Sequence, residues 1–391
     1  MNVFFKWWQS VNIDIKYTAL FSVVLISYVT YLLLQPSVDY YSAIPYDGKQ
    51  YLKGAAYFAG GVEEYLVGYP FHSRIGVPYV TSLFSTIDVV TMFIVINSIS
   101  LVFFFWLLIV FLKTYGNSSF QNISFVVLWM SFHFMGPVRY YFHDPVSIDL
   151  PAMVLEALVV LSFFKRWHII LVIAAVLSLF VKESIIPLLV MLSIASVFFH
   201  RGQSLVMLLS TLVLVVITKW QIGEFYSMEF FYWKYKSIYT LYYNIKRVIL
   251  DPVEILQWLA SLLFIGSLFL VKIKPLKGLD QNQKTILLLG LYGVGIALVG
   301  GNDYTRLQFF SGIFIFSSLV IFMRNLPQKQ FFLLLVCSLP FLRLFTIFPK
   351  KYSYKTFPEY FDAFTCVLWI GYFLLIFGLY HYFDRRRNKI V

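Results

Sequence analysis

Charged and histidine side chains are rare in this 391-residue chain, yet many of them gather in five short segments. These segments are residues 45–52 with Asp47, 69–78 with Arg74, 136–149 with Arg139, His143, Asp144 and Asp149, 182–184 with Lys182 and Glu183, and 300–306 with Asp303 and Arg306. A carboxylate can take a proton from a hydroxyl group, and arginine or lysine can hold phosphate oxygens. If the fold brings the five segments together, they form a reaction centre for such chemistry.

Each acidic residue also has a structural interpretation. A short amphipathic helix is predicted to begin after Asp47, whose side chain would cap that helix, a contribution of about 1 kcal/mol. Asp144 precedes Pro145, which is typical of an N-cap followed by proline at the first helical position. Asp149 is predicted to lie one turn inside an apolar helix, with Glu156 deeper in it. Ionisable groups in such places are functional candidates, although a neighbouring helix could equally supply Glu156 with a structural partner.

The basic residues have structural alternatives too. Arg74 precedes an apolar stretch, where its side chain could reach the lipid headgroups instead of a substrate phosphate. Lys182 and Glu183 could pair with each other in a tight turn. Asp303 and Arg306 stand one helical turn apart and could form a modest bridge.

Apolar helices must position these residues. Hydrophobic residues make up 60% of the chain, charged residues 13%, and the mean hydropathy is +0.77. A soluble domain carries about 25% charged residues. We therefore expect an all-α polytopic membrane protein with about twelve transmembrane helices of roughly 20 residues each. The predicted spans are residues 17–34, 89–112, 120–135, 146–164, 168–181, 184–199, 204–219, 255–271, 284–300, 307–323, 330–348 and 362–383.

An even number of crossings places both termini on one side of the membrane. Lysines and arginines of the short loops fall mostly on that side, which the positive-inside rule makes cytoplasmic. These residues are Lys113, Lys165, Arg166, Arg201, Lys272, Lys274, Lys277, Arg324, Lys329 and Arg385 to Arg387. The five segments that could do chemistry then all lie on the outer face. Basic residues in 220–257 and in 349–351 also fall there. The first segment is long enough for the rule to lose force, and the second is a minor violation of it.

We expect one transmembrane domain, residues 1–391, with two larger outer segments. Residues 35–88 form the first, in which short interfacial helices are predicted. Residues 220–257 form the second and are rich in Tyr, Trp and Lys, as are segments at the headgroup level. The chain contains 31 Lys and Arg but only 19 Asp and Glu. This excess of basic residues is expected for cytoplasmic loops that contact anionic lipids. It does not indicate nucleic acid, because no soluble stretch is long enough for a basic domain.

The five segments resemble motifs of the GT-C superfamily of integral-membrane glycosyltransferases, which use polyprenyl-phosphate sugars. The motifs are Tyr46-Asp47-Gly48 with Tyr51, Arg74 followed by Ile75-Gly76-Val77-Pro78, Phe142-His143-Asp144-Pro145, Lys182-Glu183-Ser184, and Asp303-Tyr304-Thr305-Arg306. The layout of most of the chain is similar, but the motifs are short. The chain lacks a doubled Asp-Asp or Asp-Glu in the first outer loop and a large C-terminal soluble domain. No cofactor is therefore assigned, and a need for a divalent metal stays open.

The resemblance implies an inverting transfer of a sugar to a hydroxyl of a glycan, lipid or polymer at the outer face of the membrane. The Phe-, Ile- and Lys-rich composition indicates a bacterial cytoplasmic membrane. Asp47 matches the catalytic carboxylate of the family, and Asp144 is a second catalytic candidate. Lys182 and Arg306 match residues that hold the donor phosphate. The further binding candidates are Arg74, Arg139, His143, Asp149, Glu183 and Asp303.

Two other function classes fit the same composition. An envelope polysaccharide polymerase or ligase would carry its arginines in two large outer loops and would not need Asp47. A transporter or flippase of lipid-linked glycans would place charged residues at the bilayer midplane, in broken helices of corresponding halves. Here most ionisable groups lie at one surface, and no internal repeat is visible.

Overall fold

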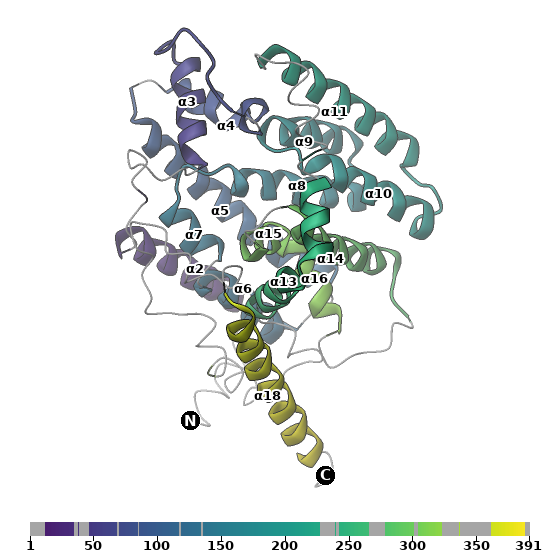
Figure 1. The fold of residues 1–391 in the computed structure, drawn as a ribbon. Helices are drawn as coiled ribbons and strands as arrows, with labels where there is room; N and C mark the ends of the chain where they lie inside the picture. The colour runs from purple at the N-terminus through teal and green to yellow at the C-terminus, as the bar shows by residue number, and fades with distance from the viewer. Residues whose placement is uncertain are drawn as a thin grey trace.

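The described part of the chain is all-α, as predicted. A computed structural model describes residues 12–34, 38, 47–68, 70–84, 86–116, 119–133, 136–226, 239, 242–265, 278–300, 304–322, 336 and 361–387. Within these residues the chain forms fifteen α-helices and one short 3-10 helix. The helices gather in a bundle from which the C-terminal helix projects (Figure 1).

The helices of the first half follow the hydropathy pattern closely. They are α2 (Ile13–Leu34), α3 (Gly48–Phe58), η1 (Phe71–Ser73), α4 (Gly76–Ser82), α5 (Val89–Thr114), α6 (Phe120–Phe132), α7 (Pro137–His143), α8 (Asp149–Lys165), α9 (His168–Val181) and α10 (Ile185–Phe199). Helices α3, η1 and α4 confirm the short helices predicted between the first two apolar segments.

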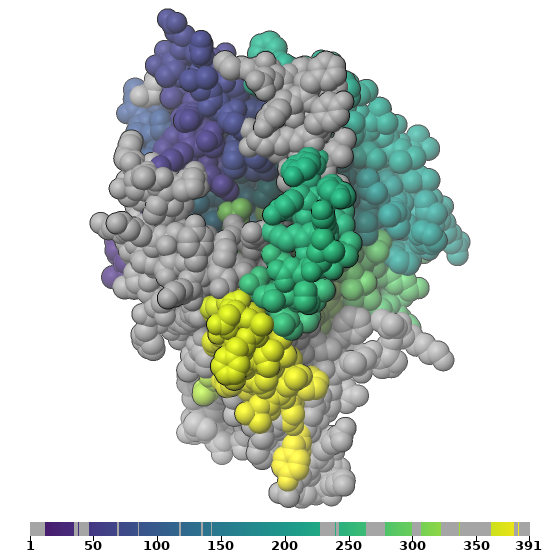
Figure 2. Space-filling model, viewed as in Figure 1, coloured from purple at the N-terminus to yellow at the C-terminus, as the bar shows by residue number. Residues whose placement is uncertain are grey.

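The second half contains fewer described residues. Its helices are α11 (Leu205–Tyr226), α13 (Pro252–Ile265), α14 (Gln281–Gly300), α15 (Tyr304–Phe310), α16 (Gly312–Phe322) and α18 (Ala363–Arg387). Figure 2 shows α13 in green and α18 in yellow on one face of the molecule, with the purple and blue atoms of α3 and α4 above them. The predicted span 330–348 lies almost entirely outside the described residues.

Three of the described helices, α2, α5 and α11, are long and apolar enough to cross a membrane. Shorter apolar helices of 10 to 17 residues occur at His168–Val181, Ile185–Phe199, Gly312–Ile321 and Ala363–Gly378. A crossing takes about 20 residues of α-helix, so each of the three long helices is long enough to cross a membrane. The layout with twelve crossings stays a prediction.

Three predicted boundaries are wrong. Helix α6 ends at Phe132 rather than at residue 135, and the chain starts again as α7 with Pro137 in its first turn. Helix α11 continues past Lys219 to Tyr226, where the Trp220 indole donates to Glu224 one turn later at 2.5 Å. The predicted span 307–323 is two helices, α15 and α16, which meet at Ser311 and Gly312.

Helix α8 lies at the centre of the bundle and contacts α5, α9, α10 and α15. The loop before it is held by Asn97, a buried residue of α5. The Asn97 amide nitrogen donates to the carbonyl oxygens of Pro145 at 2.8 Å and Ser147 at 3.0 Å. These bonds satisfy backbone groups that the loop would otherwise bury unpaired. They also fix the position at which α8 begins, at Asp149.

Helices α14 and α16 approach closely because glycine leaves room between them. A Cβ atom at Gly290 would lie 2.6 Å from the Ser318 Cβ atom, whereas a Cβ at Gly295 of the same helix would meet nothing within 4 Å. A Cβ atom at Gly312 would lie 2.8 Å from the Met130 methyl carbon, so α16 also approaches α6 closely. The packing of α16 thus depends on small residues.

We predict that Gly290→Ala destabilises the protein by about 1–3 kcal/mol, because the added methyl group overpacks the contact with Ser318. The matched variant Gly295→Ala should be neutral or stabilising by up to about 1 kcal/mol, because it only raises helix propensity. Thermal unfolding of both variants in detergent measures the difference. Equal melting temperatures for the two variants would contradict this packing.

Candidate functional site

Helix α3 places Asp47 at its start, but the side chain does not cap the helix. Asp47 has helical backbone angles and makes no side-chain capping hydrogen bond to α3. Its Oδ2 atom instead lies 3.5 Å from the Nη2 atom of Arg306, and 42% of its side chain is exposed. The predicted helix is therefore confirmed, the capping role is wrong, and the carboxylate remains accessible beside a guanidinium.

Arg74 lies just after η1 and points inward. Its Nε and Nη2 atoms donate to the two carboxylate oxygens of Glu183, at 3.0 and 2.5 Å. Its Nη1 atom donates to the hydroxyl of Tyr51, at 3.2 Å, from one turn inside α3. Two parallel bonds to one carboxylate form a strong and geometrically specific pair. Only 12% of the Arg74 side chain is exposed, so the interpretation as a headgroup anchor is wrong.

Glu183 is shared by two cations. Besides Arg74, the Nζ atom of Lys219 lies 3.5 Å from its Oε2 atom, and the same ammonium donates to the Ser73 hydroxyl at 2.6 Å. Burial alone would raise the pKa of Glu183, but Arg74 and then Lys219 outweigh it and hold the pKa well below its usual range. Glu183 is therefore an anion that positions two basic side chains.

Lys182 pairs with Asp149 rather than with its neighbour Glu183. The Lys182 Nζ atom lies 2.7 Å from Asp149 Oδ1, and only 8% of the Asp149 side chain is exposed. The ammonium also lies 4.2 Å from the centre of the Phe310 ring. The other Asp149 oxygen lies 3.8 Å from Arg306 Nε. The alternative in which Lys182 and Glu183 form a self-contained pair is wrong, because each binds a residue distant in sequence.

Arg306 joins Asp149 to Asp47. Its three nitrogens reach three partners: Asp149, Asp47 and the hydroxyl of Tyr140, to which Nη1 donates at 3.1 Å. The guanidinium thus bridges the start of α8, the start of α3 and the short helix α7. We call the group of Asp47, Arg74, Asp149, Lys182, Glu183, Lys219 and Arg306 the ionic network.

The ionic network lies at one end of the helices. Asp149 begins α8, Lys182 and Glu183 form the turn from α9 to α10, and Lys219 lies in the last turns of α11. Among the described residues of the network four cationic side chains face three carboxylates, which leaves one positive charge in excess in that part of the chain. Such a site favours one additional negative charge, for example a phosphate group.

The other candidates on α7 are buried in its packing. Arg139 is fully buried, with its guanidinium carbon 5.0 Å from the centre of the Tyr31 ring. His143 is buried, and its carbonyl oxygen accepts from the Val38 backbone at 2.8 Å. Asp144 is buried and ends α7, so its predicted role as N-cap of the next helix is wrong. The reason is that Pro145 to Ile148 form a loop held by Asn97, and α8 begins only at Asp149.

Two further predicted residues stand apart from these ion pairs. Asp303 lies outside the described residues, so its pairing with Arg306 stays a prediction. Glu156, two turns into α8, accepts a hydrogen bond from the Ser184 hydroxyl at 2.5 Å. Glu156 thus has a partner on the turn that carries Glu183.

Sequence reasoning missed three residues of this region: Lys219, Tyr140 and His72. Lys219 ends a long apolar run, a position where a lysine usually reaches for the interface, so nothing marked it as an inward-facing cation. Tyr140 is one of many tyrosines in the chain. His72 is two residues from Arg74 and 5% exposed.

Among the described residues, no three His, Cys, Asp or Glu side chains gather closely enough to hold a metal ion. The two carboxylates nearest Arg306, those of Asp47 and Asp149, are each engaged by a basic side chain. The chemistry that can be read from the ionic network is therefore proton transfer at an exposed carboxylate and charge stabilisation by fixed cations.

We predict that His72 makes stability depend on pH. Burial and the nearby Lys219 ammonium lower the pKa of His72 to about 4, from an ordinary value of 6.5. Between these values the unfolded chain binds the proton more readily, so stability is lost as the pH falls from 6.5 toward 4. At pH 5 the loss relative to pH 7.5 is about 2 kcal/mol.

The variant His72→Gln should lack this component, while all other titrating groups act alike in both proteins. Unfolding in detergent at pH 7.5 and at pH 5 measures the difference. The same loss of stability in the variant and the wild type would show that His72 is not held in its neutral form.

Comparison with known protein families, with curated proteins and with solved structures finds no match for this chain. Any statement about function therefore depends on the geometry of the ionic network and on the motifs in the sequence. Of the ten residues named from those motifs, the ionic network contains Asp47, Arg74, Asp149, Lys182, Glu183 and Arg306.

Proposed function

We propose that this chain is an integral-membrane glycosyltransferase of the GT-C type. It moves a sugar from a polyprenyl-phosphate donor to a hydroxyl group of a glycan, lipid or polymer acceptor. The observation that carries the proposal is the position of Asp47, an exposed carboxylate from the first outer segment. It lies 3.5 Å from Arg306, which also faces the Asp149 carboxylate that Lys182 binds.

The charge balance of the ionic network supports a phosphate-linked donor. A sugar joined to a polyprenyl monophosphate is a phosphodiester and carries one negative charge, which matches the single excess positive charge of the network. Arg306 and Lys182 are the candidates for contact with that phosphate. They share Asp149, which holds their side chains in place before the substrate arrives. Such preorganised cations stabilise charge that develops on a leaving group.

The chemical step needs a base beside these cations. The acceptor oxygen forms a bond to the anomeric carbon, the bond from that carbon to the phosphate oxygen breaks, and polyprenyl phosphate leaves with the electron pair. Asp47 takes the proton of the acceptor hydroxyl. Asp149 is less suited to this role, because it is buried and paired with Lys182. Direct displacement of this kind inverts the anomeric carbon.

The same proposal includes the membrane topology. Three helices meet the length and composition for a crossing, and the remaining predicted spans bring the proposed number to twelve. The ionic network lies at the helix ends opposite the short basic loops with Arg166 and Arg201. By the positive-inside rule those loops are cytoplasmic, so we place the network at the outer face of a bacterial inner membrane.

We predict that Asp47→Asn abolishes function while Asp88→Asn does not. Asp88 is a matched control, because it precedes α5 at the end of the same outer segment, and its carboxylate accepts from the Thr91 backbone at 2.9 Å. Asparagine can take over that capping role. A host that lacks the gene, complemented with each variant, is compared by mass spectrometry of surface glycans and lipid-linked sugars.

We expect that one sugar disappears from the surface glycans in the null strain and in the Asp47→Asn strain. Its polyprenyl-phosphate donor should accumulate in both, and Asp88→Asn should restore the normal profile. A normal profile of surface glycans and lipid-linked sugars in the Asp47→Asn strain would show that Asp47 is not the catalytic base. A change of chain length, or the trapping of whole repeat units, would favour a polymerase or a flippase instead.

A further inference from the structure

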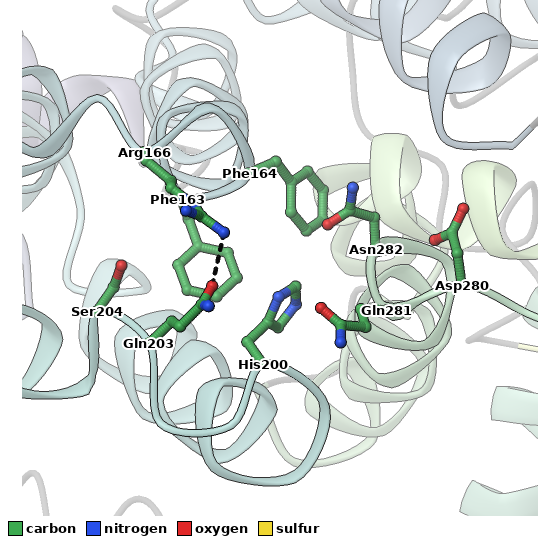
Figure 3. Close-up of a pocket in the computed structure, with 9 residues that line it drawn as sticks. All are labelled: Phe163, Phe164, Arg166, His200, Gln203, Ser204, Asp280, Gln281 and Asn282. Atoms are coloured by element: carbon green, nitrogen blue, oxygen red, sulfur yellow. Dashed lines mark hydrogen bonds between the residues drawn. The ribbon is translucent and has the colours of Figure 1, made fainter.

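A polar cavity lies at the end of the bundle opposite the ionic network. It measures about 380 Å³ and is lined from four helix ends, those of α8, α10, α11 and α14. Figure 3 shows Arg166, Gln203 and Ser204 on one side of it, Asp280, Gln281 and Asn282 on the other, and His200 between them. Helix α8 runs from Asp149 in the network to this cavity, a length of about 25 Å for 17 residues.

The two charged side chains of the cavity lie on opposite sides (Figure 3). Arg166 donates from Nη2 to the Gln203 amide oxygen at 2.8 Å, which orients the guanidinium and leaves its other N–H groups for a ligand. Asp280 accepts from the Gln283 backbone at 2.8 Å through Oδ1, as the cap of α14. A second carboxylate oxygen therefore remains for a ligand.

His200 separates the two charges as a neutral group. Its Nε2 atom lies 2.9 Å from the Thr285 hydroxyl, which itself donates to the Gln281 carbonyl at 2.9 Å. The hydroxyl must accept from His200, so the Nε2 atom carries the hydrogen. Burial, and then the Arg166 charge, lower the pKa of His200, which keeps the ring uncharged at neutral pH. The cavity thus has one positive and one negative pole.

The backbone around this cavity is unusual. The non-glycine residues with positive φ in the described part of the chain are Arg166 at 59°, Arg201 at 53° and Ser204 at 62°. Two of them line the cavity, and Arg201 lies in the same turn as Ser204. Left-handed backbone costs about 1 kcal/mol or more at such residues and tends to occur where a site depends on it. At Arg166 the left-handed backbone ends α8, and the side chain of this residue donates to Gln203.

We propose that this cavity binds a zwitterionic group of the phosphoethanolamine type, with its phosphate at Arg166 and its ammonium at Asp280. Opposite charges at the two poles favour a ligand with one charge of each sign over an anion, which Asp280 would repel. The amides of Gln203, Gln281 and Asn282 offer further donors and acceptors for phosphate and ester oxygens. The source of the group is either a membrane lipid headgroup or a free metabolite.

The test uses the purified full chain, stripped of bound lipid, and native mass spectrometry. The protein is offered equal amounts of phosphatidylethanolamine and phosphatidylglycerol, and the bound fractions are compared. Two variants remove one pole each: Arg166→Asn, because asparagine tolerates left-handed backbone, and Asp280→Asn, because asparagine keeps the helix cap. Lys165→Gln is the matched control, since Lys165 is an exposed cation next to Arg166 that does not line the cavity.

We expect the wild type and Lys165→Gln to retain phosphatidylethanolamine about tenfold better than phosphatidylglycerol. Each pole variant should lose about tenfold in retention, as expected for one charge-assisted hydrogen bond. If free phosphoethanolamine displaces the lipid, a soluble metabolite is a sufficient ligand, and if it does not, the ligand is the lipid. Equal retention of both lipids by the wild type, or an unchanged preference in both pole variants, would overturn the proposal.

Discussion

The pairing of the buried Asp149 carboxylate with Lys182 is the interaction on which the rest of the structure depends. A charged group at the start of a helix buried in the centre of a bundle is stable only if a partner and hydrogen bonds offset its loss of water. Asp149 begins α8 and Lys182 follows α9, so their contact at 2.7 Å holds together one end of the helix pair at the centre of the bundle. Removing one partner of such a pair costs about 3–5 kcal/mol.

The other site residues follow from that constraint. Once Lys182 faces Asp149, its neighbour Glu183 is presented to Arg74 and Lys219, which ties the segment after η1 and helix α11 to the same turn. Arg306 takes the second oxygen of Asp149 and reaches Asp47. The Asn97 amide fixes the loop before Asp149. A substrate phosphate would therefore meet cations that the fold already holds in position.

The sequence predicted which residues belong to the ionic network better than it predicted which of them form ion pairs with each other. Asp47, Arg74, Asp149, Lys182, Glu183 and Arg306 were identifiable because a charge in an apolar chain is costly and needs a reason. Their partners were not, because contacts such as Arg74 with Glu183 join residues more than a hundred positions apart. The local signal misled at Asp144, whose following proline resembled a helix start. Lys219 gave no signal, because it was only the last residue of a predicted span.

Helix positions were predictable wherever hydropathy alone decides them, as in α5 and α9. The prediction failed where packing breaks a continuous apolar run, as at Ser311 and Gly312, because no local pattern records the close approach of Met130. The polar cavity at Arg166 and His200 left no sequence signal either. Its residues come from four helix ends, and the short basic loops there were interpreted only as topology signals.

In the proposed reaction the ionic network binds the phosphate of a polyprenyl-phosphate donor. The most direct measurement is equilibrium binding of a polyprenyl phosphate to the purified full chain and to Lys182→Met, with Lys53→Met, an exposed lysine of α3, as control. The account predicts that the wild type and the Lys53→Met variant bind alike. Lys182→Met should bind about tenfold or more weakly, because one charge-assisted contact is lost. Equal binding by all three proteins, or no binding to the wild type, would contradict the claim.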